Sequence, residues 1–303
     1  MSQSVSINSN TLSSLDSSSF HPLSYQMNLI QPSEYHKTIS LLRDFFLSKG
    51  FIEVPCQSRM SILAACEDPS TVQTYHFLDE IWPLPQTGQM WLEHELLKNP
   101  HCAGFFCVTT SYREEKNPIP GRHHTIFPMF EFETHGGIEA LKKLEKELVV
   151  FLGLADKEED VLEKPYLELA NHYGVADLSF KEEGAMCKEF SYNLLLTDFP
   201  VYTSPFWNMA LYDDQQTAKK VDVIINGQET IGSAERSSNR DEMKHMFYTI
   251  SEGGYAKLLF DKFGKERVEK ELNNFLSYDF FQRCGGGIGV TRLISALADK
   301  GII

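Results

Sequence analysis

The sequence predicts a mixed α+β domain. Three observations favour this class: segments with apolar residues at helical spacing, short β-favouring apolar runs between them, and an Asn-Gly turn signal at the end of one such run. The 303 residues are enough for one large domain, and 42% hydrophobic with 23% charged residues is ordinary for a globular chain. We therefore expect strands and helices that interleave along one chain.

The N-terminal half of this domain is predicted to contain one helix and three strands. Residues 35–50 have apolar side chains at near-helical spacing and end at a glycine, which indicates a helix. Residues 51–54 favour a short strand that stops before a proline. Residues 104–110 are apolar and β-favouring, and residues 126–133 alternate aromatic or apolar side chains with others, so each is expected to be a strand.

The C-terminal half is predicted to begin and end with helices. Residues 138–152 form an amphipathic pattern with one apolar face. Residues 221–225 are a short apolar strand, followed by the hairpin turn signal Asn226-Gly227. Residues 266–276 are expected to be helical, and residues 285–297 are expected to pass from a glycine run into an apolar helix.

The composition of the chain argues against several classes of protein. Residues 1–34 are predicted to be a Ser-rich, disordered tail, because nine of the first 20 residues are serines and no Lys or Arg precedes Lys37. This segment lacks the features of a secretory signal or a transit peptide, and no apolar run approaches the ~18–20 residues that span a bilayer. We therefore expect a cytoplasmic protein with no membrane partner and one domain over residues 35–303.

The cysteines and the charge give two further expectations. No CxxC pair occurs among the six cysteines, so we expect mostly buried, reduced thiols: Cys56, Cys66, Cys102, Cys107, Cys187 and Cys284. The 28 Lys and Arg against 42 Asp and Glu give a net charge of −14. A chain this acidic is not expected to bind nucleic acid over a broad basic surface, although a local basic patch stays possible.

A cluster of cationic and aromatic residues could bind a nucleotide. Arg113 and Glu115 end one expected strand, Arg122 and His123 lie in the loop after it, and Phe127 begins the next strand. A guanidinium matches phosphate oxygens in a bidentate geometry, and a purine can stack on an aromatic ring or on another Arg. An ordinary surface ion pair would explain any one of these residues taken singly.

Two more segments add to this pattern. Asp222 and Glu229 flank the expected turn, so both carboxylates can converge on a hard cation such as Mg²⁺. In the run 285–292, Gly287 and Gly289 let a ligand approach the backbone, and the helix that follows presents Arg292. Taken together and in this order, the three segments predict a nucleotide site.

These segments resemble the catalytic domain of class II aminoacyl-tRNA synthetases, in the aspartyl/asparaginyl/lysyl subgroup. Residues 112–127 resemble the second motif of that family, and residues 285–292 match its third motif, Gly-x-Gly-x-Gly-x-x-Arg. Residues 37–55 resemble the first motif, which builds the dimer interface. The resemblance covers about residues 35–297, and it implies an antiparallel sheet flanked by helices, a bent ATP and a homodimer.

The resemblance also implies roles for the residues at the ATP. Arg113 would grip the α-phosphate and the activated carboxylate, and Glu115 would hold the adenine side. Adenine would stack between Phe127 and Arg292, beside the glycine run. The remaining ATP-site residues would be the loop pair near the γ-phosphate and the two Mg²⁺ carboxylates: Arg122, His123, Asp222 and Glu229.

The resemblance places the amino-acid substrate on four further residues. Glu67 would take its α-amino group, Gln89 would lie beside that group, and Arg236 would hold a side-chain oxygen. The segment Thr87-Gly-Gln-Met-Trp-Leu-Glu93 is similar to the asparaginyl pattern Ser-Gly-Gln-Leu-x-x-Glu. Leu92 replaces the lysine of the aspartyl pattern, and Glu93 could accept the NH₂ of a carboxamide, so asparagine is expected ahead of aspartate.

Three functions are consistent with these residues. The favoured one is ATP-dependent activation of asparagine or aspartate, with transfer to a non-tRNA acceptor such as ammonia or an amine on a protein or small molecule. The acidity of the chain, and the expectation that no anticodon-binding barrel precedes the domain, favour that acceptor. The alternatives are a truncated asparaginyl-type enzyme that charges tRNA and a non-catalytic regulatory paralogue. The catalytic residues Arg113 and Arg292 argue against the regulatory paralogue, as do Asp222 and Glu229.

Overall fold

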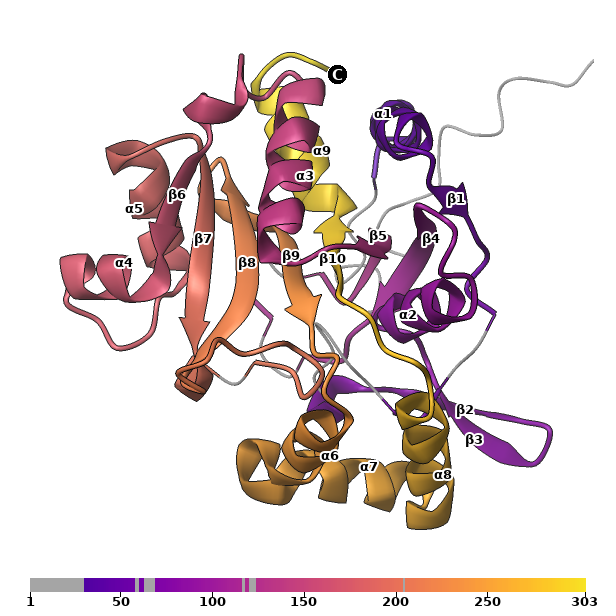
Figure 1. The fold of residues 1–303 in the computed structure, drawn as a ribbon. Helices are drawn as coiled ribbons and strands as arrows, with labels where there is room; N and C mark the ends of the chain where they lie inside the picture. Colours follow the sequence, from indigo (N-terminus) through magenta and orange to yellow (C-terminus); the bar gives the residue numbers. More distant parts are fainter. Residues whose placement is uncertain (1–29, 58–59, 63–68, 116–117, 120–123, 204) are drawn as a thin grey trace, which may run out of the picture.

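A computed structural model describes residues 30–57, 60–62, 69–115, 118–119, 124–203 and 205–303. Within these residues an eight-stranded sheet has the order β1-β4-β5-β10-β9-β8-β7-β6, and a separate hairpin pairs β2 with β3 (Figure 1). Neighbouring strands of the large sheet run antiparallel, except for β1 with β4 and β6 with β7. The predicted α+β class, with an antiparallel sheet flanked by helices, is confirmed. None of the helices in the described ranges is long and apolar enough to cross a membrane.

The strands of the large sheet are β1 (Ile52–Glu53), β4 (Gly104–Tyr112), β5 (Ile126–His135), β6 (Leu162–Pro165), β7 (Asn193–Pro200), β8 (Thr217–Ile225), β9 (Gln228–Arg236) and β10 (Arg283–Gly289). The hairpin consists of β2 (Thr74–Phe77) and β3 (Glu80–Pro83). The longest strands are β4, β5, β8 and β9, and none of them lies at an edge of the sheet.

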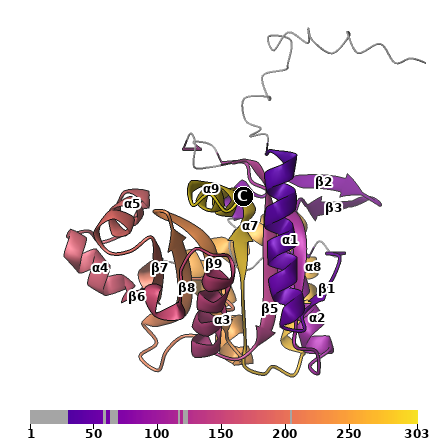
Figure 2. The same cartoon turned by 90° about the horizontal axis from the view of Figure 1, so that it is seen from above.

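Helices cover both faces of the sheet. Three of them share the largest apolar core with the sheet: α1 (Pro32–Ser48), α3 (Ile138–Phe151) and α9 (Val290–Asp299). Helix α2 (Gln89–Lys98) packs on the opposite face, against β4 and β5. Two helices lie at the β6–β7 edge: α4 (Tyr166–Tyr173) and α5 (Phe180–Glu189). Three more gather beyond one end of the strands: α6 (Arg240–Thr249), α7 (Gly254–Phe263) and α8 (Lys265–Leu276) (Figures 1 and 2).

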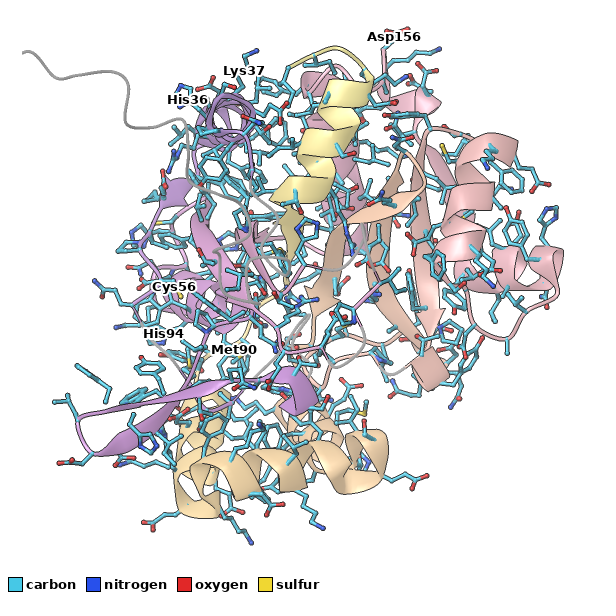
Figure 3. All side chains as sticks on the ribbon, turned by 180° about the vertical axis from the view of Figure 1, so that it is seen from behind. His36, Lys37, Cys56, Met90, His94 and Asp156 are labelled. Atoms are coloured by element: carbon cyan, nitrogen blue, oxygen red, sulfur yellow. The ribbon has the colours of Figure 1, made fainter. Side chains whose placement is uncertain are left out.

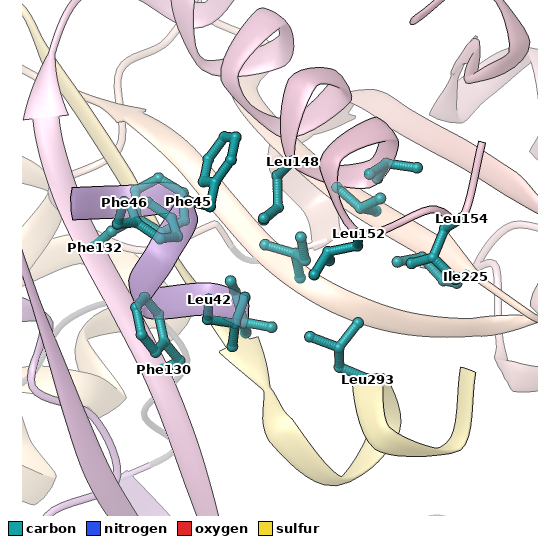
Figure 4. Close-up of a cluster of buried hydrophobic side chains, with 14 of the residues drawn as sticks. Leu42, Phe45, Phe46, Phe130, Phe132, Leu148, Leu152, Leu154, Ile225 and Leu293 are labelled. Carbon is teal, nitrogen blue, oxygen red and sulfur yellow. The ribbon is translucent and has the colours of Figure 1, made fainter. Parts of the chain in front are cut away.

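Alternation along β4 and β5 separates the two faces. Phe106 of β4, with Phe130 and Phe132 of β5, faces the core under α1, where the ring of Phe46 lies 5.0–6.0 Å from each of them (Figure 4). Phe105, one residue earlier on β4, packs on the other side with α2. Because successive side chains of a strand point to opposite faces, Met129, Glu131 and Glu133 of β5 lie on the α2 side.

Several predicted elements are confirmed with small changes in their bounds. The expected helices over 35–50, 138–152 and 266–276 are α1, α3 and α8, and the strands over 104–110 and 126–133 are β4 and β5. The turn at Asn226-Gly227 has φ angles of 51° and 72°, as a tight hairpin requires. Helix α1 begins at Pro32, inside the predicted tail over 1–34, and residues 1–29 lie outside the described residues.

The expected passage from a glycine run into an apolar helix over 285–297 is confirmed: the run lies in the central strand β10, and helix α9 begins at Val290. Glycine is needed in the strand because a Cβ on Gly286 would lie 2.5 Å from the Cβ of Ser233. One expectation needs correction, because the thiols are less buried than expected. Among the five described cysteines, only Cys107 and Cys284 are buried, while Cys56 (labelled in Figure 3), Cys102 and Cys187 are partly exposed.

Candidate functional site

A cavity of about 370 Å³ lies on the α2 side of the central strands. It is built where β5, β8, β9 and β10 lie side by side and the N-terminus of α9 begins. Eight residues predicted from the sequence line it: Arg113, Glu115, Phe127, Glu229, Arg236, Gly287, Gly289 and Arg292. The structure therefore brings together residues that are up to 179 positions apart in the chain, from Arg113 to Arg292.

One wall of the cavity pairs a guanidinium with an aromatic ring. The guanidinium carbon of Arg113 lies 5.3 Å from the ring centroid of Phe127. The two residues meet because β4 and β5 are antiparallel neighbours, with Tyr112 opposite Ile126 at the end of the ladder. A planar cation beside a ring offers both an anion ligand and a stacking surface to the same molecule.

The opposite wall is a flat stretch of backbone. Gly287 of β10 lies opposite Gly232 of β9, so neither strand adds a side chain at this pair. A Cβ on Gly287 would lie 2.8 Å from the terminal methyl of Met129. Nearby, Nη1 of Arg292 donates to the backbone carbonyl of Glu229 at 2.5 Å, which fixes the guanidinium at the edge of the cavity. The glycine backbone and this second guanidinium thus line the same cavity.

Two carboxylates, those of Asp222 and Glu229, interact electrostatically near this wall. Asp222 on β8 is 6% exposed, and its Oδ2 accepts from the Nζ of Lys220 at 2.8 Å. Burial raises the pKa of Asp222 to about 7; the neighbouring carboxylate of Glu229 also raises it, while Lys220 lowers it. The other oxygen, Oδ1, is buried and has no hydrogen-bond partner within the described part of the chain.

This pair fits a hard divalent cation. Mg²⁺ prefers oxygen ligands and is often held by one or two carboxylates plus phosphates and water. A buried carboxylate oxygen without a donor, beside a second carboxylate, supplies such ligands. Across the described ranges no group of three or more His, Cys, Asp or Glu side chains could hold a metal.

A buried network of charged side chains forms the floor beside Arg236. The Nη2 of Arg236 lies 3.3 Å from Oε2 of Glu133, which also accepts a hydrogen bond from the amide of Gln89. Burial raises the pKa of Glu133 to about 7, although Arg236 opposes this shift. The side-chain oxygens of Glu93 accept from Arg283 at 2.6 and 3.0 Å and from Asn208 at 2.6 Å.

The network changes the interpretation of two predicted substrate ligands. Gln89 and Glu93 are buried and do not line the cavity. Whether Glu93 accepts the NH₂ of a carboxamide stays a prediction: in this structure its oxygens accept from Asn208 and Arg283. The asparagine preference was predicted from this residue and stays a prediction with it. Three other predicted residues lie outside the described residues: Glu67, Arg122 and His123.

Some residues of the site were not among the predicted ligands. Glu131 accepts from the hydroxyls of Thr87 and Thr109 and from the Gly88 N–H, and burial raises its pKa. Its position as an acid between the apolar residues Phe130 and Phe132 was a signal for it. The cavity lining adds further residues that the motifs do not mark: His124, Met129, Phe206, Met209, Lys220, Thr230, Gly232, Ser233 and Thr291.

Comparison with known proteins gives one family. The family model described as tRNA synthetases class II (D, K and N) matches residues 33–303. No curated protein matches the sequence. Among solved structures, the chain is similar to asparaginyl-tRNA synthetase from Pyrococcus horikoshii complexed with asparaginyl-adenylate, with a TM-score of 0.71 and 21% identity over 91% of this chain.

Two more solved structures are similar to the chain. Asparaginyl-tRNA synthetase from Entamoeba histolytica in complex with asparaginyl-adenylate has a TM-score of 0.70 and 18% identity over 88% of this chain. Aspartyl tRNA synthetase from Entamoeba histolytica has a TM-score of 0.62 and 18% identity over 87% of this chain. The chain spans 65%, 63% and 54% of these three proteins, which is less than two thirds of each. At these identities the likeness shows the fold.

Proposed function

Since this chain belongs to the class II tRNA synthetases of the D, K and N group, we propose that it is an ATP-dependent ligase that activates an amino acid as its adenylate. The observation that carries the proposal is the cavity in which Arg113, Phe127 and Arg292 meet over bare glycine backbone. Two structural neighbours are described in complex with asparaginyl-adenylate, which is the product of such a reaction.

The reaction exchanges one bond at phosphorus for another. A carboxylate oxygen of the amino acid attacks the α-phosphorus of ATP, and the bond from that phosphorus to the pyrophosphate oxygen breaks. The products are an aminoacyl-adenylate and pyrophosphate. The attacking carboxylate is already ionised near neutral pH, so no general base is required. Catalysis then depends on holding the two reactants in line and on opposing the charge that develops at the α-phosphate.

Residues of the cavity wall would carry these tasks. Arg113 would bind the α-phosphate oxygens and oppose their growing negative charge. Phe127 and Arg292 would hold adenine between them, with Glu115 at its edge. Gly287 and Gly289 would leave space for the nucleotide, and outside the described residues Arg122 and His123 would lie near the γ-phosphate. The support for these roles is that the described members line one cavity.

Asp222 and Glu229 would hold Mg²⁺, which when bound with ATP supplies positive charge to the phosphates. The donor-free Oδ1 of Asp222 supports this assignment. On the amino-acid side, Arg236 would bind a side-chain oxygen of the substrate, with Glu67 and Gln89 near its α-amino group. Arg236 lines the cavity. Gln89 does not, but its amide donates to Glu133, the carboxylate that pairs with Arg236.

We propose asparagine or aspartate as the amino acid and an acceptor other than tRNA, such as ammonia or an amine. The structural neighbours named for asparagine and aspartate support the first choice, and the net charge of −14 supports the second. A homodimer through residues 37–55 is proposed as well, because Leu47 and Ile52 in that segment are 53% and 46% exposed apolar residues. A cytoplasmic location completes the proposal.

Amino-acid-dependent exchange of labelled pyrophosphate into ATP tests the proposed activity. Each of the twenty amino acids is assayed with the wild type, with Arg113→Ala, and with Arg240→Ala, which removes an exposed arginine outside the cavity. We expect exchange with asparagine or aspartate that Arg113→Ala loses and Arg240→Ala keeps. Absence of exchange with all twenty would contradict the proposal and favour a non-catalytic paralogue.

The acceptor is tested in a second assay that measures AMP release. Each reaction contains the activated amino acid with ammonia, with a small-molecule amine, or with unfractionated tRNA. AMP release that requires ammonia or the amine supports a non-tRNA acceptor. Acid-precipitable aminoacyl-tRNA, formed at a rate comparable to exchange, would show instead that the chain charges tRNA.

A further inference from the structure

Each of the two proposed metal carboxylates already faces a cation of the protein. The Nζ of Lys220 lies 2.8 Å from Oδ2 of Asp222, and the Nη1 of Arg292 lies 3.7 Å from Oε2 of Glu229. Each carboxylate therefore has a positive side chain beside it before any metal binds, while Glu183 adds a further negative charge near Asp222. A divalent cation that bound here would meet repulsion from both partners.

The Lys220 ammonium is held firmly in this position. It lies 3.9 Å from the ring centroid of Phe199 on β7, which is buried, so the charge rests on an aromatic face as well as on Asp222. The side chain is 22% exposed and lines the cavity. Its place follows from the pleat of β8: Val221 and Val223 face the core under α3, so Lys220 and Asp222 lie on the other side of the strand, where Lys220 lines the cavity.

The adjacent lysine, Lys219, does not share the contact that Lys220 makes with Asp222. Lys219 has the opposite parity on β8, and its Nζ pairs with Glu235 at 3.0 Å. It lines a separate hollow near the start of α3 and not the cavity of the proposed site. The side chains of Lys219 and Lys220 are similarly exposed, at 23% and 22%, but they lie on opposite faces of one strand. Lys219 is a matched control for any effect of charge.

A resident charge at this distance has a large effect on a cation site. One neighbouring unit charge changes the affinity of a carboxylate for a proton by about tenfold to a thousandfold. A doubly charged ion experiences twice the Coulomb energy of a proton at the same separation. Lys220 also occupies one of the two oxygens of Asp222, so a metal that needs this oxygen must displace the ammonium.

We propose that Lys220 is a resident cation that keeps the Asp222–Glu229 pair from binding a divalent cation by itself, so that the pair takes up the ion only together with the phosphates of a nucleotide. This inference rests on the proposed function only in taking Asp222 and Glu229 as the metal carboxylates. With a nucleotide bound, the phosphates supply the negative charge that Lys220 otherwise cancels. Lys220 acts through Asp222, so it is a positioning residue for the ion.

The binding of Mn²⁺ alone tests the proposal without any turnover. It is measured as the decrease in the electron-paramagnetic-resonance signal of unbound Mn²⁺. The variants are Lys220→Met, Lys220→Gln, Lys220→Arg and, as the control, Lys219→Met, each checked for folding by circular dichroism. We expect Lys220→Met to bind Mn²⁺ roughly tenfold or more tightly than the wild type. Lys220→Arg and Lys219→Met are expected to bind like the wild type. If Lys220→Met does not fold, Lys220→Gln replaces it, and the same tightening of Mn²⁺ binding is expected.

A second arm adds α,β-methylene-ATP, which cannot undergo the activation step. The affinity of the wild type for Mn²⁺ is expected to rise at least about tenfold with this analogue, and that of Lys220→Met is expected to rise less. Equal Mn²⁺ affinity in folded Lys220→Met and wild type would overturn the proposal. So would a tightening in Lys219→Met as large as in Lys220→Met. Because no amino acid is present, these results do not depend on whether pyrophosphate exchange is found.

Discussion

Replacing Glu93 by alanine is expected to lower the free energy of unfolding by about 3 kcal/mol, because it leaves Arg283 buried without its carboxylate. Both side chains are 0% exposed, and Glu93 accepts two hydrogen bonds from Arg283 and one from Asn208. Breaking a buried ion pair costs about 3–5 kcal/mol. We expect the lower end, since Arg283 keeps the Ser237 carbonyl at 3.1 Å and the Phe280 ring at 4.8 Å.

Urea unfolding, followed by circular dichroism, measures this loss. The control is Glu53→Ala, which breaks the bidentate pair with Arg43 on the surface and should cost less than about 1 kcal/mol. The reasoning is refuted if Glu93→Ala unfolds at the same urea concentration as the wild type, with an unchanged slope. In that case Glu93 would be available to the substrate after all, and the variant should instead lose its asparagine-dependent exchange.

Three further predictions follow from the same structure. Arg113→Ala should slow pyrophosphate exchange by about 3–4 kcal/mol of activation free energy, as the loss of one anion-stabilising donor does, and an unchanged rate would contradict its proposed role. Phe46→Ala should lower the unfolding free energy by about 3–5 kcal/mol in urea, because it empties the centre of the aromatic cluster against Phe130 and Phe132. Burial raises the pKa of Glu145 to about 8, with a further increase from Asp222 and a decrease from Ser233. The folded protein then holds a proton that the unfolded chain releases near pH 4.5, so stability should decline as the pH rises from about 4.5 to 8. Glu145→Gln should flatten this decline in urea midpoints measured across that pH range, and an equally steep decline in the variant would show that other groups cause it.

Local patterns predict the parts of the fold that local physics determines. Helix α1 follows from its apolar stripe, and the turn after β8 follows from Asn226-Gly227. The side of the sheet on which the cavity lies could also be read from β5, where phenylalanines alternate with other side chains. Residues that face the cavity from β5 are those between the phenylalanines of the core.

What could not be predicted depends on partners that are distant in the chain. Glu93 and Arg283 are 190 positions apart, so nothing near Glu93 shows that its carboxylate is already bound. The glycine run was predicted to lead into a helix, and it does. Its place as a central strand was not predicted, because glycine has low intrinsic strand propensity. Only the close approach of Ser233 and Gly232 to Gly286 explains why glycine is needed inside the sheet.

The distribution of charge separates the nucleotide site from the rest of the surface. The chain has a net charge of −14, yet the described residues that line the cavity include the cations Arg113, Lys220, Arg236 and Arg292 against the acids Glu115 and Glu229. A concave site with an excess of positive groups attracts polyanions such as ATP, while the acidic exterior repels extended ones such as nucleic acid. Because both effects are screened by salt, raising the ionic strength should weaken ATP binding and reduce discrimination against tRNA at the same time. A salt series of ATP and tRNA affinities checks this: if tRNA binding weakened steeply with salt, as it does for a basic surface, the acidity of the chain would say nothing about its acceptor.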